Sequence, residues 1–211
     1  MATEISGTKR PGGRTERTRL AALNATLELL GERGYAELTV EAVAERSGVH
    51  KTTLYRRWES AEGLVAAALL LGAEQEWAVP DTGSLEGDLR AITLELVRYF
   101  TTPGERELPT ASISAAFLSP RAADALREFY VDRHARSAAA VARAIERGEV
   151  PPGTDPVEPV RVACGPVFYR LFVSREGVTP QDAGVAAAAA AAAAKAGVFT
   201  ATDGGTAPLP G

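Results

Sequence analysis

Residues 39–58 decide the fold of this chain, and they read Thr39-Val-Glu-Ala-Val-Ala-Glu-Arg-Ser-Gly-Val-His-Lys-Thr-Thr-Leu-Tyr-Arg-Arg-Trp58. Ala44 and Gly48 stand four residues apart, as in a helix-turn-helix. The small side chain lets a second helix pack closely, and the glycine supplies the positive φ of the tight turn. The apolar residues expected to point inward are Val43, Val49 and Leu54. The second helix then presents a short basic surface of the size that enters a DNA major groove.

The charge distribution supports this prediction, although the whole chain carries a net charge of -4. Residues 1–64 contain ten Lys or Arg and nine Asp or Glu, so the acidic excess lies in the rest of the chain. Residues 9–19 hold five basic side chains against Glu16 alone, and residues 46–58 hold four with no acid. Phosphate neutralisation requires only such a local footprint. For the first stretch taken alone, a solvated helix face is the alternative.

Length and composition restrict the class of protein further. A chain of 211 residues allows one large or two small domains. The single cysteine, Cys164, excludes an internal disulfide and suits a reducing compartment. The N-terminus lacks an apolar signal segment, and the longest apolar run, residues 185–194, is shorter than the roughly 20 residues of a membrane span. We therefore expect a soluble cytoplasmic protein without a membrane partner. Arginine outnumbers lysine 20 to 3, a bias typical of GC-rich bacterial genomes.

Apolar residues recur at spacings of three and four along most of the chain, which predicts helices. No segment alternates with a period of two, so strands are not expected. We predict an all-α fold of about nine helices. Its expected parts are a flexible basic arm at 1–14, a helix-turn-helix DNA-binding domain at 15–59, a helical ligand-binding and dimerisation domain at 60–199 and a disordered tail at 200–211.

Capping residues predict where the helices begin and end. Gly34 is expected to end the first helix. Ser60 is the expected N-cap of a helix that runs through Trp77, and Ser84 the N-cap of the next. The other predicted helices are a short one around 113–118, one from Ser119-Pro120 to Gly148, one from the capping box Asp155-Pro156 to near Gly177, and one from the capping box Thr179-Pro180 to near Gly197.

The N-terminal third resembles the DNA-binding domain of the tetracycline-repressor (TetR) family of bacterial regulators. The residues that carry the resemblance are Gly34-Tyr35, Thr39-Val40, Val43-Ala44, Gly48-Val49, Leu54-Tyr55, Trp58 and Leu64. Beyond residue 64 the chain is similar only in the number and length of its helices. Where the family often has Ser-Lys-Glu, this chain has Ser60-Ala61-Glu62, so one phosphate contact is expected to be missing. The arginine-rich arm is expected to compensate for it.

The resemblance implies a sequence-specific DNA-binding transcriptional regulator whose recognition helix is residues 50–57. The implied DNA-binding residues are Lys9, Arg10, Arg14, Thr39, His50, Lys51, Thr52, Thr53, Tyr55, Arg56 and Arg57. Side chains of the recognition helix would contact bases and phosphates, and the arm would enter the minor groove. Two alternatives stay open at this point: Tyr55 packs in the core beside Trp58, and the arm is a tail without function.

A single helix-turn-helix covers too few base pairs for useful specificity, so a homodimer on a palindromic operator is expected. The family dimerises through its last two helices. The residues assigned to the interface are Val160, Val167, Leu171, Ala186 and Ala190. The alternative is that these two helices pack only within their own subunit.

The resemblance also implies that the C-terminal helices bind a small-molecule effector that releases a repressor from its operator by a population shift. The assigned ligand-binding residues are Trp77, Phe100, Phe117, Tyr130, His134, Phe168, Tyr169 and Phe172. Plain core packing is the alternative for each aromatic residue. An inward-pointing Arg133, His134 or Arg170 would favour an anionic ligand.

Catalysis is not expected. The chain has two histidines and one cysteine, and it contains no metal-ligand spacing, nucleophile elbow or phosphate-binding glycine motif. We therefore predict no cofactor and no metal. The competing hypothesis is a helical ligand-binding or scaffold dimer with only weak, non-specific DNA affinity.

Overall fold

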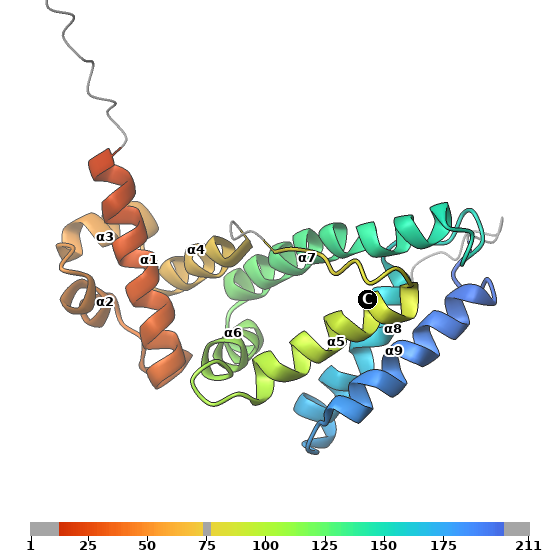
Figure 1. Ribbon diagram of the computed structural model, residues 1–211. Helices are drawn as coiled ribbons and strands as arrows, with labels where there is room; N and C mark the ends of the chain where they lie inside the picture. The colour runs from red at the N-terminus through yellow and green to blue at the C-terminus, as the bar shows by residue number, and fades with distance from the viewer. Residues whose placement is uncertain (1–12, 74–76, 201–211) are drawn as a thin grey trace, which may run out of the picture. The chain divides into compact units, whose positions relative to one another are not determined.

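The computed structural model describes residues 13–73 and 77–200, and within them the predicted all-α fold is confirmed (Figure 1). The nine α-helices of these residues are α1 Gly13–Arg33, α2 Val40–Ser47, α3 Lys51–Trp58, α4 Ala61–Ala73, α5 Leu85–Thr101, α6 Glu107–Leu118, α7 Pro120–Glu146, α8 Glu158–Phe168 and α9 Pro180–Lys195. A short 3-10 helix, η1 (Tyr35–Glu37), precedes α2, and a π-helical segment, η2 (Tyr169–Ser174), follows α8. The described residues contain no strand, only an isolated bridge between Thr154 and Thr200.

The described residues form two compact units. The first unit comprises those of Met1–Glu74 together with Glu107–Phe129, and the second comprises those of Gln75–Arg106 together with Tyr130–Gly211. Helices α4 and α6 therefore pack in the same unit as α1, α2 and α3, and α7 begins in the first unit and ends in the second. This division differs from the proposed domains 15–59 and 60–199, because α4 and α6 contribute to the core around α1.

The core of the first unit lies between α1 and the three helices that contact it, α2, α4 and α6. Leu23 and Leu30 of α1 are fully buried, as the leucine spacing predicts, and Gly34 ends the helix with a φ of 78°. Val43 of α2 and Leu54 of α3 are also fully buried. These apolar contacts hold the helix-turn-helix against α1.

Local chemistry sets the geometry of the helix-turn-helix. The Thr39 hydroxyl accepts a hydrogen bond from the Ala42 amide at 3.1 Å and caps α2. Gly48 follows α2 with a φ of 68°, which is the left-handed conformation predicted for the turn. The Ser60 hydroxyl accepts from the Gly63 amide at 3.1 Å at the start of α4.

Gly63 determines how closely α4 approaches the end of α3. A Cβ atom at this position would lie 2.0 Å from the carbonyl oxygen of Trp58. No side chain fits there without moving backbone. Trp58 itself is buried in the core of the first unit. The absent side chain at residue 63 therefore positions α3 relative to α4.

The core of the second unit lies where α5, α8 and α9 pack against one another (Figure 1). The alanines of α9 allow this close approach: Ala183, Ala187 and Ala190 are fully buried. The Thr93 hydroxyl of α5 donates to the Ala183 carbonyl oxygen at 3.1 Å, so backbone and side chain meet directly. The predicted capping box at the start of α9 is confirmed between Thr179 and Asp182.

Residues 77–84 form an extended segment that crosses to the start of α5. Asp88 is fully buried and accepts hydrogen bonds from the amide and the hydroxyl of Thr82, at 2.6 and 2.8 Å. Arg143 of α7 approaches the same carboxylate at 3.4 Å and donates to the carbonyl oxygen of Pro80. A buried charge is thereby paired and hydrogen-bonded, which fixes the segment to α5 and α7.

Two predicted helix ends were wrong. Trp77 lies in the extended segment rather than in α4, whose described residues end at Ala73. Helix α8 ends at Phe168 rather than near Gly177, and Pro166, which has no amide proton to donate, lies in its last turn. The backbone continues as the π-helical η2, a common adjustment where the regular bonding pattern is interrupted.

No helix in the described parts of the chain is long and apolar enough to cross a membrane.

We predict that Gly63→Ala lowers the free energy of unfolding by about 1–3 kcal/mol, because the new methyl group overlaps the Trp58 carbonyl. The matched control is Gly31→Ala, also within a helix of the first unit. Its Cβ would lie 3.5 Å from the nearest atom, an ordinary contact, so stability should be unchanged or higher. Urea unfolding of both variants measures the difference. Equal stability of the two variants would contradict the assigned role of Gly63.

Candidate functional site

Helix α3 exposes one face and buries the other. Leu54 and Trp58 are buried in the first unit, which fixes the rotation of the helix about its own axis. Thr53 is half-buried. The predicted DNA-contact residues at the surface are Thr39, His50, Lys51, Thr52, Tyr55, Arg56 and Arg57. All of them except Thr39, which caps α2, belong to the N-cap or body of one basic helix.

His50 caps α3 rather than standing on its outer face. Its Nδ1 atom accepts a hydrogen bond from the Thr52 amide at 3.3 Å and lies 3.0 Å from the Thr52 hydroxyl. A neutral imidazole that accepts at Nδ1 carries its proton on Nε2. His50 thus offers a hydrogen-bond donor at the exposed N-terminus of the recognition helix.

Tyr55 is 43% exposed, which excludes the alternative that it packs in the core beside Trp58. Its hydroxyl donates a hydrogen bond to Glu41 Oε1 of α2 at 3.2 Å. This bond to Glu41 is the main reason that the pKa of Tyr55 is raised above its usual value. The phenol therefore lies on the exposed face of α3 with its proton directed to a carboxylate.

Arg46 braces the helix-turn-helix. It binds Glu32 through two nitrogens at 2.9 and 2.8 Å and Glu28 at 3.1 Å, both on α1. The Arg46 guanidinium holds the pKa of Glu32 below its usual value. Arg46 is thus occupied by α1, and the basic surface of the motif consists of Lys51, Arg56 and Arg57. The Arg57 guanidinium lies 5.1 Å from the ring centre of Trp58, a cation–π distance.

The predicted arm is only partly described. Lys9 and Arg10 lie outside the described residues. Arg14 was assigned to the arm, but the structure has it exposed in α1, which begins at Gly13. Ala61, the departure from the family pattern, is half-buried at the first position of α4 and offers no cation there. The neighbouring Glu62 accepts a hydrogen bond from Ser119 at the start of α7.

Several of the predicted ligand-binding residues form one cluster in the second unit. Phe100 of α5 lies 5.7 Å from Phe168 and 5.3 Å from Phe172, measured between ring centres. Tyr130 of α7 lies 6.0 Å from Phe168 and 6.0 Å from His134. We call Phe100, Tyr130, His134, Phe168 and Phe172 the aromatic cluster. Most of its ring pairs meet edge to face, a favourable arrangement for packed rings.

Burial changes the ionisation of groups in and around the aromatic cluster. It raises the pKa of Tyr130 to about 12, and it raises the pKa of the Cys164 thiol to about 12. Burial also lowers the pKa of His134, assisted by Arg161. All three groups are therefore neutral at neutral pH. The aromatic cluster thus presents uncharged side chains.

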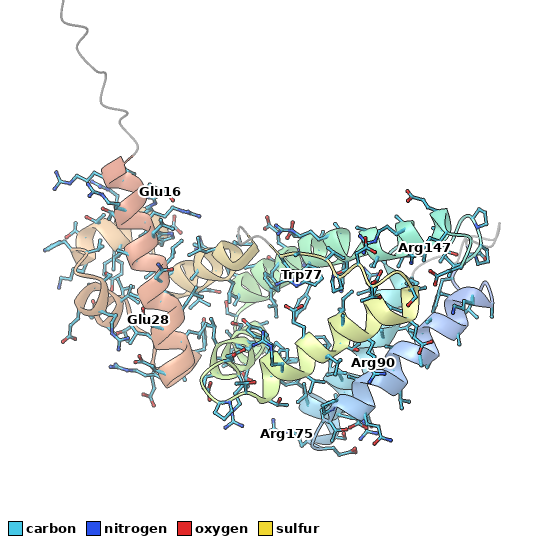
Figure 2. The ribbon with its side chains drawn as sticks, in the orientation of Figure 1. Glu16, Glu28, Trp77, Arg90, Arg147 and Arg175 are labelled. Atoms are coloured by element: carbon cyan, nitrogen blue, oxygen red, sulfur yellow. The ribbon has the colours of Figure 1, made fainter. Side chains whose placement is uncertain are left out.

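Trp77 contacts two charged side chains, Glu95 and Arg133. Trp77 is labelled in Figure 2. Its indole nitrogen donates to both carboxylate oxygens of Glu95, at 3.0 and 2.9 Å. The Arg133 guanidinium lies 4.5 Å from the Trp77 ring centre. Burial lowers the pKa of Arg133. The polar groups next to the aromatic cluster thus include one cation and one anion.

Two of the predicted ligand residues lie apart from the aromatic cluster. Phe117 belongs to the first unit and is 85% exposed. Tyr169 is 58% exposed and lines a surface hollow of about 440 Å³ with Pro166, Arg170 and Glu176. The Tyr169 ring is therefore largely in solvent, whereas Phe168 and Phe172 contact each other and Phe100 within the cluster.

The structure places most of the predicted dimer residues inside the protomer. Val160, Val167, Ala186 and Ala190 are buried, since α8 and α9 use these faces to contact α5 and each other. Leu171 is half-buried. The side chains that α8, η2 and α9 expose instead at helical spacing are Val162, Pro166, Tyr169 and Val173, followed by Gln181, Val185, Ala189 and Ala192. We call these eight residues the α8–α9 face.

Family comparisons agree with the fold and the exposed basic helix. Residues 22–68 match the model for bacterial regulatory proteins of the tetR family, and residues 79–193 match the tetracyclin repressor-like C-terminal domain. The chain is 31% identical over 171 residues to the uncharacterised HTH-type transcriptional regulator YdeS of Bacillus subtilis, covering 81% of this chain and 86% of the relative. It is 35% identical over 135 residues to the DNA-binding transcriptional repressor TetR of Mycobacteroides abscessus, covering 63% and 70%.

A solved structure gives the same assignment. The TetR family transcription regulator SCO0332 is 34% identical, with a TM-score of 0.66, covering 83% of this chain and 97% of that chain. The fold and the basic helix thus define a helix-turn-helix transcriptional regulator. The chain belongs to the tetracycline-repressor family.

Sequence reasoning missed three features of these sites: Glu41 as the partner of Tyr55, Gly63 behind α3, and the α8–α9 face. The valines at 162, 173 and 185 could have indicated the α8–α9 face. However, the buried positions of the same helices show an equally regular apolar pattern, so the sequence does not distinguish the two faces. No sequence pattern indicated that Glu41 is the hydrogen-bond partner of Tyr55.

We predict that the folded protein protects Cys164 from thiol reagents at about pH 8. With its pKa raised to about 12, only about one thiol in 10⁴ is ionised at that pH, and the thiolate is the reactive form. Reaction with Ellman's reagent should be at least about 100-fold slower in the folded protein than in urea-unfolded protein. Similar rates in both states would contradict the packing of α8 beside the aromatic cluster.

Proposed function

We propose that this chain is a homodimeric repressor that reads a palindromic operator with α3 and is released from it by a small-molecule effector. The observation that carries the proposal is the two-sided character of α3. Leu54 and Trp58 anchor one face in the core, and the opposite face exposes Lys51, Thr52 and Arg56. A rigid, basic, exposed helix of this kind fits the major groove.

The exposed residues have distinct proposed roles. Lys51 and Thr52, near the N-terminus of α3, are placed to contact base edges, where a guanine or a thymine methyl offers a partner. Arg56 and Arg57, in the last turn, would neutralise phosphates on either sequence. His50 would donate from Nε2 while its Nδ1 keeps the helix capped. Thr39, Thr53 and Tyr55 complete the proposed contacts from the recognition unit, and Lys9, Arg10 and Arg14 those from the arm.

Dimerisation would use the α8–α9 face. Its exposed valines and Tyr169 form an apolar surface on two neighbouring helices, and the alanines at 189 and 192 allow close approach of another helix. Two α8–α9 pairs would then form a four-helix interface. A two-fold arrangement would place the recognition helices about 34–36 Å apart, one turn of DNA.

Effector binding would occur at the aromatic cluster. Its neutral aromatic surface suits an apolar ligand, and Arg133 and Glu95 nearby would orient a polar group. Tyr130 and His134 lie on α7, the same continuous helix whose first residues belong to the core of the first unit. A ligand that favours one position of α7 would shift the population of recognition-helix spacings.

Repression in the bacterial cytoplasm is the mode of action we propose, because a relative of this chain is named as a DNA-binding transcriptional repressor. The competing possibility, a residual basic patch with weak non-specific affinity, predicts steeply salt-sensitive association without sequence preference.

Substitutions on α3 test the proposed roles. Arg56→Ala should weaken binding to all duplexes alike and reduce the salt dependence by about one phosphate contact. Thr52→Ala and Lys51→Ala should also change the sequence preference, by about 1–3 kcal/mol at the contacted base pair. Arg98→Ala removes an exposed arginine from α5 of the second unit and should leave binding unchanged. Fluorescence anisotropy at several salt concentrations measures all four variants. Unchanged binding by the three α3 variants would remove this helix from the interface.

Substitution on the α8–α9 face tests the proposed dimer. Val185→Asp should raise the dimer dissociation constant at least about 100-fold, because an unpaired carboxylate in an apolar interface is strongly destabilising. Val131→Asp is the matched control: Val131 is 61% exposed and Val185 64%, but Val131 lies on α7, outside the proposed interface. Sedimentation equilibrium measures the constant. A Val185→Asp protein that remains as dimeric as the control would contradict the assignment.

A further inference from the structure

The Tyr55 hydroxyl already donates its hydrogen to another side chain of the protein. A phenol has one hydrogen to donate, and Tyr55 donates it to Glu41 Oε1 at 3.2 Å. Both side chains are exposed, on the surface that the proposed function presents to DNA. A phosphate oxygen is also an acceptor without a proton of its own. It can therefore be bound by Tyr55 as donor only if the hydroxyl turns away from Glu41.

Glu41 is negatively charged like a phosphate, and it lies at the N-terminus of a helix, where phosphates often bind. It is the second residue of α2, directly after Val40, in the turn that Thr39 caps. Anionic groups are stabilised in the first turn of a helix, where amide groups point outward. Glu41 thus accepts from the Tyr55 hydroxyl and carries its charge in the first turn of α2, two features that a phosphate bound at the recognition unit would share.

We propose that Glu41 competes with an operator phosphate for the Tyr55 hydroxyl, so that its carboxylate acts as an internal substitute for that phosphate in the DNA-free protein. This inference rests on the proposed function of α3 as a DNA-binding helix. Two acceptors of one hydroxyl lie within about 6 Å of each other, since each is about 3 Å from the oxygen. The hydroxyl has one hydrogen and can donate it to only one of these acceptors at a time, and the two anions also repel each other weakly at that separation.

The competition has a defined effect on recognition. Each Tyr55 must break its bond to Glu41 before it binds phosphate, so Glu41 weakens binding to every duplex, whatever its sequence. Base contacts by Lys51 and Thr52 are untouched by this exchange. Glu41 consequently lowers the affinity for non-specific and specific DNA by the same factor and leaves the ratio between them unchanged.

A double-mutant cycle separates this competition from plain charge repulsion. Glu41→Ala removes both the charge and the bond to Tyr55. The matched control is Glu45→Ala, one turn further along the exposed side of α2, which removes the same charge but leaves Tyr55 and Glu41 in place. Each is also combined with Tyr55→Phe, which removes the contested hydroxyl. Far-ultraviolet circular dichroism and urea unfolding confirm that all variants are folded.

The probe is a 30-base-pair duplex of arbitrary sequence at about 50 mM salt, because the competition concerns phosphate and requires no operator. With Tyr55 present, Glu41→Ala should tighten binding about threefold to tenfold more than Glu45→Ala does, the size of one exposed hydrogen bond. With Tyr55→Phe, the two alanine variants should have equal affinities.

Two results would overturn the proposal. An equal gain from Glu41→Ala with and without the Tyr55→Phe substitution would show that only charge matters, and weaker binding by Glu41→Ala would show that Glu41 positions Tyr55 for DNA. Failure of the proposed function has a different signature: the cycle behaves as expected on arbitrary duplex, but no sequence is preferred at physiological salt. Absence of binding to any duplex at low salt would overturn both.

Discussion

The recognition surface depends on the close contact between the end of α3 and the start of α4. Gly63 lies against the Trp58 carbonyl so tightly that no Cβ fits, and Trp58 and Leu54 are buried beneath. Because the inner face of α3 is held in this way, the rotation of its outer face is set by packing rather than by DNA. The recognition surface is therefore preorganised, and binding need not order it.

Charge pairing divides the arginines of the helix-turn-helix into two groups. Arg46 is occupied by Glu28 and Glu32 and braces α2 against α1. Arg56 and Arg57 stay on the exposed side of α3. An acidic protein can present a basic surface in this way, because the carboxylates paired with Arg46 offset its charge while Arg56 and Arg57 add theirs to the local field. Under our proposal, Glu41 also competes with phosphate for the Tyr55 hydroxyl on this surface.

The features that could be predicted from the sequence are those that depend on neighbouring residues in the chain. The caps at Ser84 and Thr179 and the turn at Gly48 were predictable from sequence, because each residue type satisfies a backbone requirement within a few residues of itself. The dimer residues were less predictable. Along α8 and α9 apolar side chains occur on both the buried and the exposed faces, so periodicity alone did not say that Val160 faces the core. Partners distant in sequence, such as Glu41 and Tyr55, require the fold.

One titration tests most directly whether α3 reads a specific operator. Purified protein is titrated at about 150 mM salt against the DNA that flanks its own gene and against a scrambled duplex of equal length. We predict a preference of roughly 10³-fold or more for a sequence within the flanking DNA, the range of specific regulators. Equal, weak and steeply salt-dependent binding to both duplexes would contradict it.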